Sequence, residues 1–183
     1  MKNIILTIAI VLVCAILIVG QTDVTMLQRE GYKAKNLTDE MASAATLSVD
    51  LQKYSEGFII FDYEEGCNLA RDILKVTGSY DDNYNSTGGY FKDPAEVEMF
   101  FFDQTEVCKH YVNGVFRPAD NFSFKFSDKK KVSDFLDEFE GEDFVIEYPC
   151  VCTIYHAGRP TIRASFISGL TKVTKKSIYE YKY

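Results

Sequence analysis

The chain begins with a run of apolar residues that no charged side chain interrupts. It covers residues 4–19 and reads IILTIAIVLVCAILIV. As a helix, this segment would span about 24 Å at 1.5 Å per residue, somewhat less than a hydrocarbon core of about 30 Å. On successive turns it carries Ile4, Ile8, Leu12, Ile16 and Val19. The pattern predicts a transmembrane anchor over residues 1–22.

A cleaved signal peptide is the competing interpretation of the same segment. Gly20 is an acceptable cleavage residue, but Ile18 stands at the −3 position, where a small residue is usual. The apolar run is also long for a signal peptide. We therefore expect a retained anchor, with secretion as the alternative. Lys2, at the short N-terminal end, favours an N-terminus inside the cell and a domain outside it.

A second pattern follows over residues 23–56, which contain no proline and a single glycine. Apolar or small residues recur there at intervals of three and four, which is typical of one face of a helix. The stripe consists of Val24, Leu27, Gly31, Ala34, Leu37 and Met41. Such a face suits packing along a partner helix, and it equally suits a helix that lies on its own domain. The segment predicts an amphipathic stalk helix, with a break near residues 36–39 as the alternative.

The patterns in residues 57–183 predict an α+β extracytoplasmic domain. Asp62 and Glu65 form the N-terminal signature of a helix that ends near Gly78. A second short helix is expected over residues 128–139. Alternating or apolar runs predict strands at residues 97–102, 107–112, 122–126, 144–148, 151–156, 162–167 and 177–183. We expect a mostly antiparallel sheet of four to six strands, packed by the long N-terminal helix and two short ones.

Composition narrows the class of protein. With 183 residues, of which 46% are hydrophobic, the chain has room for one packed domain and an N-terminal appendage. Its net charge of −7 repels phosphate backbones, so nucleic acid is not an expected partner.

The cysteines outside the apolar segment are Cys67, Cys108, Cys150 and Cys152. An even number outside the membrane permits disulfides. Cys150 and Cys152 would share one strand face, and each could bridge to Cys67 or Cys108. Free buried thiols are the alternative, and the sequence leaves the redox state open.

The residues that usually carry chemistry form no recognisable motif. His110 lies two residues from Cys108, and His156 four residues from Cys152, but neither pair has an orienting acid or an oxyanion hole in the sequence. A zinc site from Cys150, Cys152 and a histidine would lack a second ligand pair. We therefore expect no catalytic residues, no cofactor, no metal and no small-molecule substrate.

This organisation resembles the Tad-type (TadE/TadF/TadG-like) pilus-assembly proteins of Gram-positive bacteria, which are similar to minor pilins. The features that carry the resemblance are the hydrophobic helix at residues 4–19, the stretch Ala-Ala-x-Leu-x-Val-Asp at residues 44–50, the segment at residues 56–62 and the ending Ile-Tyr-Glu-Tyr at residues 178–181. The resemblance implies a membrane helix that serves both as an anchor and as a packing element in, or beside, a surface filament. Because the hydrophobic segment holds no glutamate and no glycine precedes it, an uncleaved accessory subunit fits better than a processed pilin.

The sequence thus predicts a membrane-anchored pilin-like structural or assembly subunit that contacts other pilus subunits. An anchored or secreted binding module is the alternative, and a large concave apolar pocket would favour it.

Overall fold

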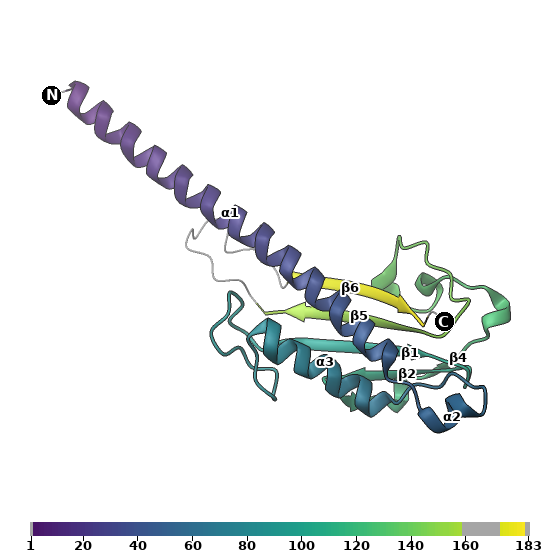
Figure 1. The fold of residues 1–183 in the computed structure, drawn as a ribbon. Coiled ribbons are helices and arrows are strands. Elements are labelled where there is room, and N and C mark those ends of the chain that lie inside the picture. Colours follow the sequence, from purple (N-terminus) through teal and green to yellow (C-terminus); the bar gives the residue numbers. More distant parts are fainter. Residues whose placement is uncertain (1, 159–172, 182–183) are drawn as a thin grey trace.

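The structure is a computed structural model that describes residues 2–158 and 173–181. The strand predicted at residues 162–167 lies outside the described residues. Helix α1 (Lys2–Leu47) leads out of the domain, and its later part lies on the sheet beside α3 (Figure 1).

Helix α1 is unbroken over its 46 residues, which corresponds to about 70 Å. The alternative of a break near residues 36–39 is therefore wrong. No proline interrupts this segment, and the threonines within it bond to the carbonyl oxygen one turn earlier, as Thr38 does to Ala34 at 2.7 Å. At the end of the helix, the hydroxyl of Ser48 donates to the carbonyl oxygen of Ala45 at 2.6 Å.

Two further helices follow along the chain. Helix α2 (Leu51–Ser55) is a short helix capped by Asp50, and α3 (Tyr63–Gly78) is the helix predicted from its N-terminal signature. The carboxylate of Asp62 accepts a hydrogen bond from the backbone N–H of Glu65 at 3.0 Å, which confirms the predicted N-cap. The helix ends where Ser79 adopts a left-handed conformation with φ of 61°.

The strands form one antiparallel sheet in the order β3-β2-β1-β5-β6, and β4 also pairs with β2. Their bounds are β1 (Glu96–Phe102), β2 (Val107–Val112), β3 (Val115–Phe116), β4 (Phe122–Ser123), β5 (Cys150–Ala157) and β6 (Val173–Glu180). Asn113 and Gly114 join β2 to β3 with φ of 50° and 75°, the two left-handed residues of a tight hairpin turn. The predicted α+β class and antiparallel sheet are confirmed.

One face of the sheet is covered by the helices. The later half of α1 lies against β5, β6 and α3, as Figure 1 shows. Met41 and Ala45 of α1 meet Leu74 of α3 and Phe101 of β1 in a continuous buried core. The domain therefore depends on α1 for one wall of its core.

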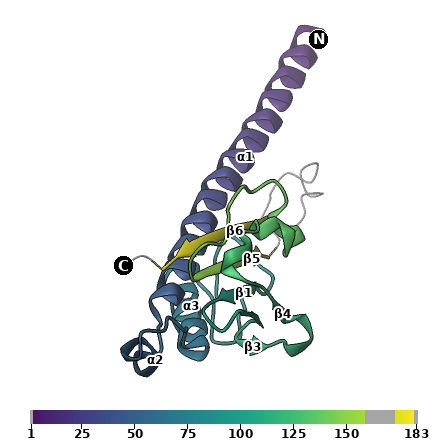
Figure 2. The same ribbon diagram turned by 90° about the vertical axis from the view of Figure 1, so that its right-hand side faces the viewer.

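Among the described residues, the turn-rich segment that follows β4 covers one end of the other face (Figure 2). Its buried side chains include Phe124, Val132, Leu136, Phe139 and Ile146, and they pack on Phe102 and the cysteines of β2 and β5.

The sequence prediction was wrong in two places within this segment. Residues 128–139 form no α-helix. They contain the end of the 3₁₀ turn η2 (Phe126–Asp128) and the turns η3 (Val132–Asp134) and η4 (Asp137–Phe139), with irregular chain between them. The strand predicted at residues 144–148 is reduced to a single bridge between Val145 and Lys131. The two errors share a cause, which is that the two segments bond to each other. The backbone N–H of Val132 donates to the carbonyl oxygen of Phe144 at 2.9 Å, and the backbone N–H of Ile146 donates to the carbonyl oxygen of Lys130 at 2.9 Å. Backbone groups used in this way cannot continue a helix.

Candidate functional site

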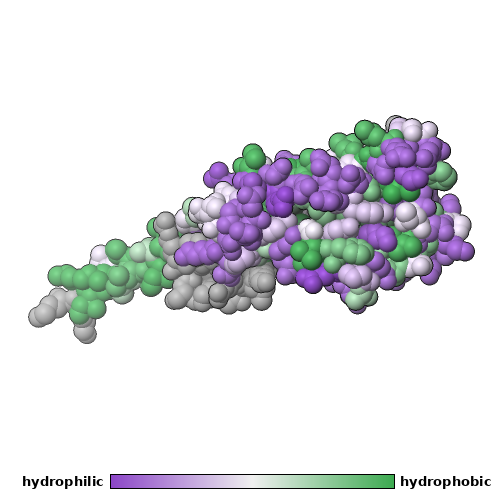
Figure 3. All heavy atoms as spheres, turned by 90° about the horizontal axis from the view of Figure 1, so that it is seen from below, coloured by the Kyte–Doolittle hydropathy of each residue, from purple (hydrophilic) through white to green (hydrophobic). Residues whose placement is uncertain are grey.

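The first half of α1 carries a large apolar surface that the domain does not cover. The predicted anchor residues Ile4, Ile8, Leu12, Ile16 and Val19 are all exposed, Ile4 at 65% and Val19 at 42%. In the described residues, α1 is the helix long and apolar enough to cross a membrane. Figure 3 shows this end as a hydrophobic projection from a mainly hydrophilic body. By length and composition, it is compatible with a membrane anchor or a signal sequence.

The predicted packing stripe is divided between two environments. Ala34, Leu37 and Met41 are buried in the core of their own domain. Leu37, for example, lies against the end of α3, where a Cβ added to Gly78 would come within 3.1 Å of its side chain. Val24 is exposed, while Leu27 and Gly31 are half-buried. From residue 34 onward the stripe of the predicted stalk therefore packs on the domain.

The stretch of α1 between the predicted anchor and the domain is partly exposed, although Asp23 within it is 3% exposed and therefore buried. Val24 and Met26 are exposed at 44% and 45%, and Tyr32 is exposed further along the same helix. These side chains extend the apolar surface of the first half beyond the predicted membrane segment.

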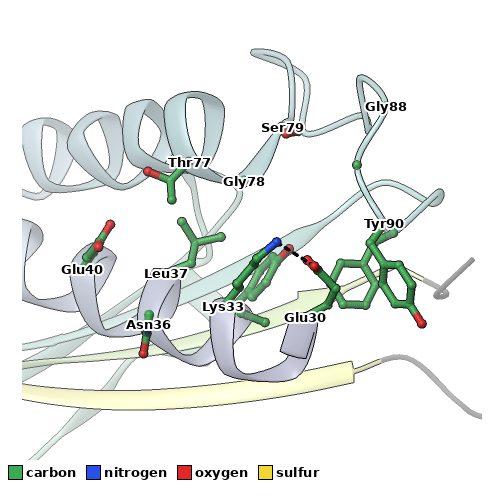
Figure 4. Close-up of a pocket in the computed structure, with 14 residues that line it drawn as sticks. Glu30, Lys33, Asn36, Leu37, Glu40, Thr77, Gly78, Ser79, Gly88 and Tyr90 are labelled. Atoms are coloured by element: carbon green, nitrogen blue, oxygen red, sulfur yellow. Dashed lines mark hydrogen bonds and ion pairs between the residues drawn. The ribbon is translucent and has the colours of Figure 1, made fainter. Parts of the chain in front are cut away.

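A groove of about 380 Å³ lies between α1 and the chain that follows α3 (Figure 4). Glu30, Lys33 and Glu40 line it from the helix, and Ser79 and Tyr90 from the opposite side. Glu30 and Lys33 form an ion pair of 2.6 Å at its wall. This mixed polar lining differs from the apolar pocket expected of a binding module.

All five cysteines are free thiols in the structure, and the four in the domain are buried. Cys67 lies in the core between the sheet and the helices, whereas Cys108, Cys150 and Cys152 lie in the core on the other face. A bridge from Cys67 to Cys150 or Cys152 would have to pass through the sheet. Burial raises the pKa of Cys67 to about 12, and it also raises the pKa of Cys108 and Cys152.

The structure brings together a cluster of carboxylates and histidines that the sequence analysis did not predict. Glu98 of β1 lies between His110 of β2 and His156 of β5. Its Oε2 is 3.2 Å from Nε2 of His110, and its Oε1 is 3.0 Å from Nε2 of His156. The strand register explains why these side chains meet. Glu98 pairs with Val112 of β2 and with Ile154 of β5. His110 lies two residues before Val112, and His156 lies two residues after Ile154. All three side chains therefore share the sheet face that the turn-rich segment leaves open.

Each imidazole has a second polar partner. Nδ1 of His110 is 3.1 Å from Oδ2 of Asp120, and Nδ1 of His156 is 2.9 Å from Oγ1 of Thr174. The ring of His110 also stacks on Phe100, with 4.2 Å between the centroids. Both ring nitrogens of His110 therefore face carboxylate oxygens, and an N–H on either nitrogen has an acceptor.

Glu98 is held ionised by this arrangement. Its hydrogen bonds with His110 and His156 lower its pKa to about 2, although partial burial acts in the opposite direction. The sequence contained a weak signal of the site, namely the polar positions that alternate with apolar ones at residues 96 and 98. No local pattern could have shown that two distant histidines meet there.

No family model, curated protein or solved structure matches this chain. The resemblance to the Tad-type pilus-assembly proteins therefore stays a prediction.

Proposed function

We propose that this chain is a membrane-anchored, pilin-like structural or assembly subunit of a Tad-like pilus system at the cell surface. The observation that carries the proposal is the division of α1 into two halves. The first half projects with its apolar side chains exposed, and the second half forms a wall of the domain core.

The exposed half of α1 favours burial in a membrane or against other helices. Removing one large aliphatic side chain from water is worth about 1.5–3 kcal/mol, and residues 4–19 present many such side chains. A helix also satisfies its own backbone hydrogen bonds, which a segment in lipid requires. Lys2 at the short end favours an orientation with the domain outside the cell.

The continuity of α1 supports retention of the anchor. The helix runs through Gly20 without a break and reaches the core at Ala34 within the following four turns. An anchor joined in this way holds the domain at a fixed angle to the membrane-spanning part of α1. A fixed angle suits a subunit that must present the same surface to each neighbour in an assembly.

Retention of the anchor can be tested by measuring the mass of the mature chain and the cell fraction in which it is found. The full chain, expressed in bacterial cells, is expected in the membrane fraction after alkaline extraction, with the N-terminal segment still attached. Recovery in the medium as a chain that begins at Gln21 would overturn the anchored form of the proposal. Such a result would favour the alternative of a secreted binding module, whose candidate surface is the groove beside Tyr90.

Photo-crosslinking from the exposed part of α1 just beyond the predicted anchor tests the assembly role. A photoreactive amino acid at Val24 is expected to give crosslinks to a second copy or to another pilus subunit in cells that carry the pilus system. The same substitution at Val76 is the matched control, because this valine is 87% exposed but lies on α3, away from the projecting helix. An anchored protein that gives no crosslink from Val24, or the same products from both positions, would contradict the assembly role.

A further inference from the structure

We propose that Glu96, Glu98 and His156 form a binding site for a divalent transition-metal ion, with Zn²⁺ as the best match. The site lies on the open end of the sheet face opposite α1. It does not depend on the proposed role in a pilus.

The three side chains already gather their ligand atoms. A carboxylate oxygen of each glutamate and a ring nitrogen of His156 lie within 4.8 Å of one another. Ligands about 2.0–2.1 Å from a tetrahedral zinc ion are about 3.3 Å apart. The observed 3.0 Å between Nε2 of His156 and Oε1 of Glu98 is close to that separation. An ion could thus take the place of the proton that now joins these atoms, after small side-chain movements.

The sheet holds the ligands in place. Glu96 is directly opposite His156 across the β1–β5 pairing, and Glu98 is the next residue of β1 on the same face. All three come from regular antiparallel strands, which position side chains more accurately than loops do. Glu96 is exposed and Glu98 half-buried, so the site is open to ions from solution.

The groups around the ligands resemble the supporting shell of a metal site. Thr174 contacts Nδ1 of His156, which fixes the ring and aims Nε2 at the carboxylates. His110 holds the second oxygen of Glu98, and Asp120 holds His110 in turn. His110 is therefore a positioning residue, because it acts on the site through Glu98.

The charge of the cluster favours a cation. Three carboxylates, from Glu96, Glu98 and Asp120, outnumber the two imidazoles, so the cluster stays negative even when both rings are protonated. The like charges of Glu96 and Glu98 repel each other on one strand face, and a bound cation would relieve this repulsion. Lys176, which shares this sheet face, is directed away to the carbonyl oxygen of Glu138 at 2.8 Å.

The donor set selects the kind of ion. Imidazole nitrogen suits zinc and other transition metals, whereas Ca²⁺ and Mg²⁺ prefer sites made entirely of oxygen. Two carboxylates and one imidazole leave the fourth tetrahedral position to water. Glu96 is exposed, so that position is accessible as far as the described residues are concerned.

Zn²⁺ titration of the full-length protein in detergent micelles tests the proposal, after removal of metal with a chelator. We expect one ion per chain by calorimetry and a rise in the unfolding temperature when Zn²⁺ is added. His156→Gln and Glu96→Gln are each expected to weaken binding by about tenfold or more, since changes to supporting residues alone cost about 10–100-fold. His110→Gln should give a smaller loss. Glu64→Gln, an exposed glutamate of α3, is the matched control and should bind as the parent does.

Cobalt absorption separates this site from binding by thiols. Co²⁺ in the parent protein is expected to show ligand-field bands without a thiolate charge-transfer band, and Glu96→Gln should weaken them. Glu96 is exposed, so its substitution should leave folding intact, and circular dichroism will verify this for each variant. Binding of Zn²⁺ that is equal in the parent and in the folded Glu96→Gln and His156→Gln variants would overturn the proposal. A thiolate band as the main cobalt signal would also overturn it.

Discussion

Lys35 of α1 donates a hydrogen bond to the backbone carbonyl oxygen of Lys176 in β6, with 2.8 Å between the two atoms. The hydroxyl of Thr46 makes a similar contact with the carbonyl oxygen of Tyr179 at 3.2 Å. Polar bonds therefore tie α1 to the edge strand β6 in addition to the apolar core beneath it. Since the helix is fixed along much of the strand, the orientation of the domain follows the orientation of α1.

The dependence of the domain on α1 gives the first prediction. Met41 is fully buried between α1 and the sheet, so Met41→Ala should lower the free energy of unfolding by about 2–4 kcal/mol. Tyr32→Ala, on the exposed face of the same helix, should change it by less than about 0.5 kcal/mol. Urea unfolding of the full chain in micelles measures both values. Equal effects would show that α1 does not belong to the core.

The close approach of α3 to the sheet gives the second prediction. A Cβ at Gly66 would lie 2.7 Å from Oγ of Ser48 and 3.1 Å from the ring of Phe101. Alanine usually stabilises a helix by about 1 kcal/mol relative to glycine. At this position the steric conflict should reverse the sign, so that Gly66→Ala destabilises the protein by about 1–3 kcal/mol.

Gly31 supplies the matched control for this substitution. It also lies in a helix, but among the described residues a Cβ there would meet only the end of the Lys175 side chain, at 3.9 Å. Gly31→Ala should therefore raise the free energy of unfolding by about 0.5–1 kcal/mol. If both substitutions stabilise the protein, the packing between α3 and the sheet is looser than the structure shows.

Local features of this fold could be predicted from the sequence, whereas features that depend on distant residues could not. Residues 4–19 and the cap at Asp62 could be recognised because hydrophobic periodicity and capping act within a few residues. The segment at residues 128–139 has the apolar spacing of a helix, and Val132, Leu136 and Phe139 are buried as that spacing predicts. Its backbone conformation is nevertheless decided by pairing with residues 144–146, more than ten positions away.

The carboxylate–histidine cluster could not be predicted for the same reason. Glu98, His110 and His156 meet only because β1 lies between β2 and β5 with one particular register. A shift of one residue in either pairing would move a histidine to the opposite face. In the sequence, each histidine is closer to a cysteine than to Glu98, so spacing along the chain favours cysteine–histidine pairs over the glutamate–histidine contacts that form.

Burial of the domain thiols gives the third prediction. Cys67, Cys108, Cys150 and Cys152 should not react with a polar alkylating reagent in the folded protein near neutral pH, because all four are buried. Burial also raises the pKa of Cys67, Cys108 and Cys152, which disfavours their reactive thiolate forms. After unfolding in guanidinium chloride, all four should react. Mass spectrometry before and after unfolding counts the labels. Protection that persists in denaturant until a reductant is added would instead indicate disulfides.

The last prediction concerns Tyr63, whose hydroxyl donates to Oδ2 of Asp103 at 2.7 Å. Asp103 is fully buried, and it also accepts from the backbone N–H of Phe61 and from Thr105. Burial and the hydrogen bond to Asp103 raise the pKa of Tyr63 well above its usual value of 10.0. The folded state therefore keeps the proton at a pH where the unfolded chain has lost it.

The sign of the pH effect follows from this difference. The contribution of Tyr63 to stability is fully present below pH 10 and declines as the pH rises above that value, by up to about 1.4 kcal/mol per pH unit. Tyr63→Phe should lower the free energy of unfolding near neutral pH, because the carboxylate of Asp103 loses one donor. The substitution should also make the decline in unfolding free energy above pH 10 shallower. Some decline will remain, because the pKa of Tyr155 and of other buried tyrosines is also raised. Urea unfolding of both proteins between neutral pH and pH 11 or so measures the two slopes. Parallel curves for the two proteins would show that Tyr63 titrates in the folded state as it does in the unfolded chain.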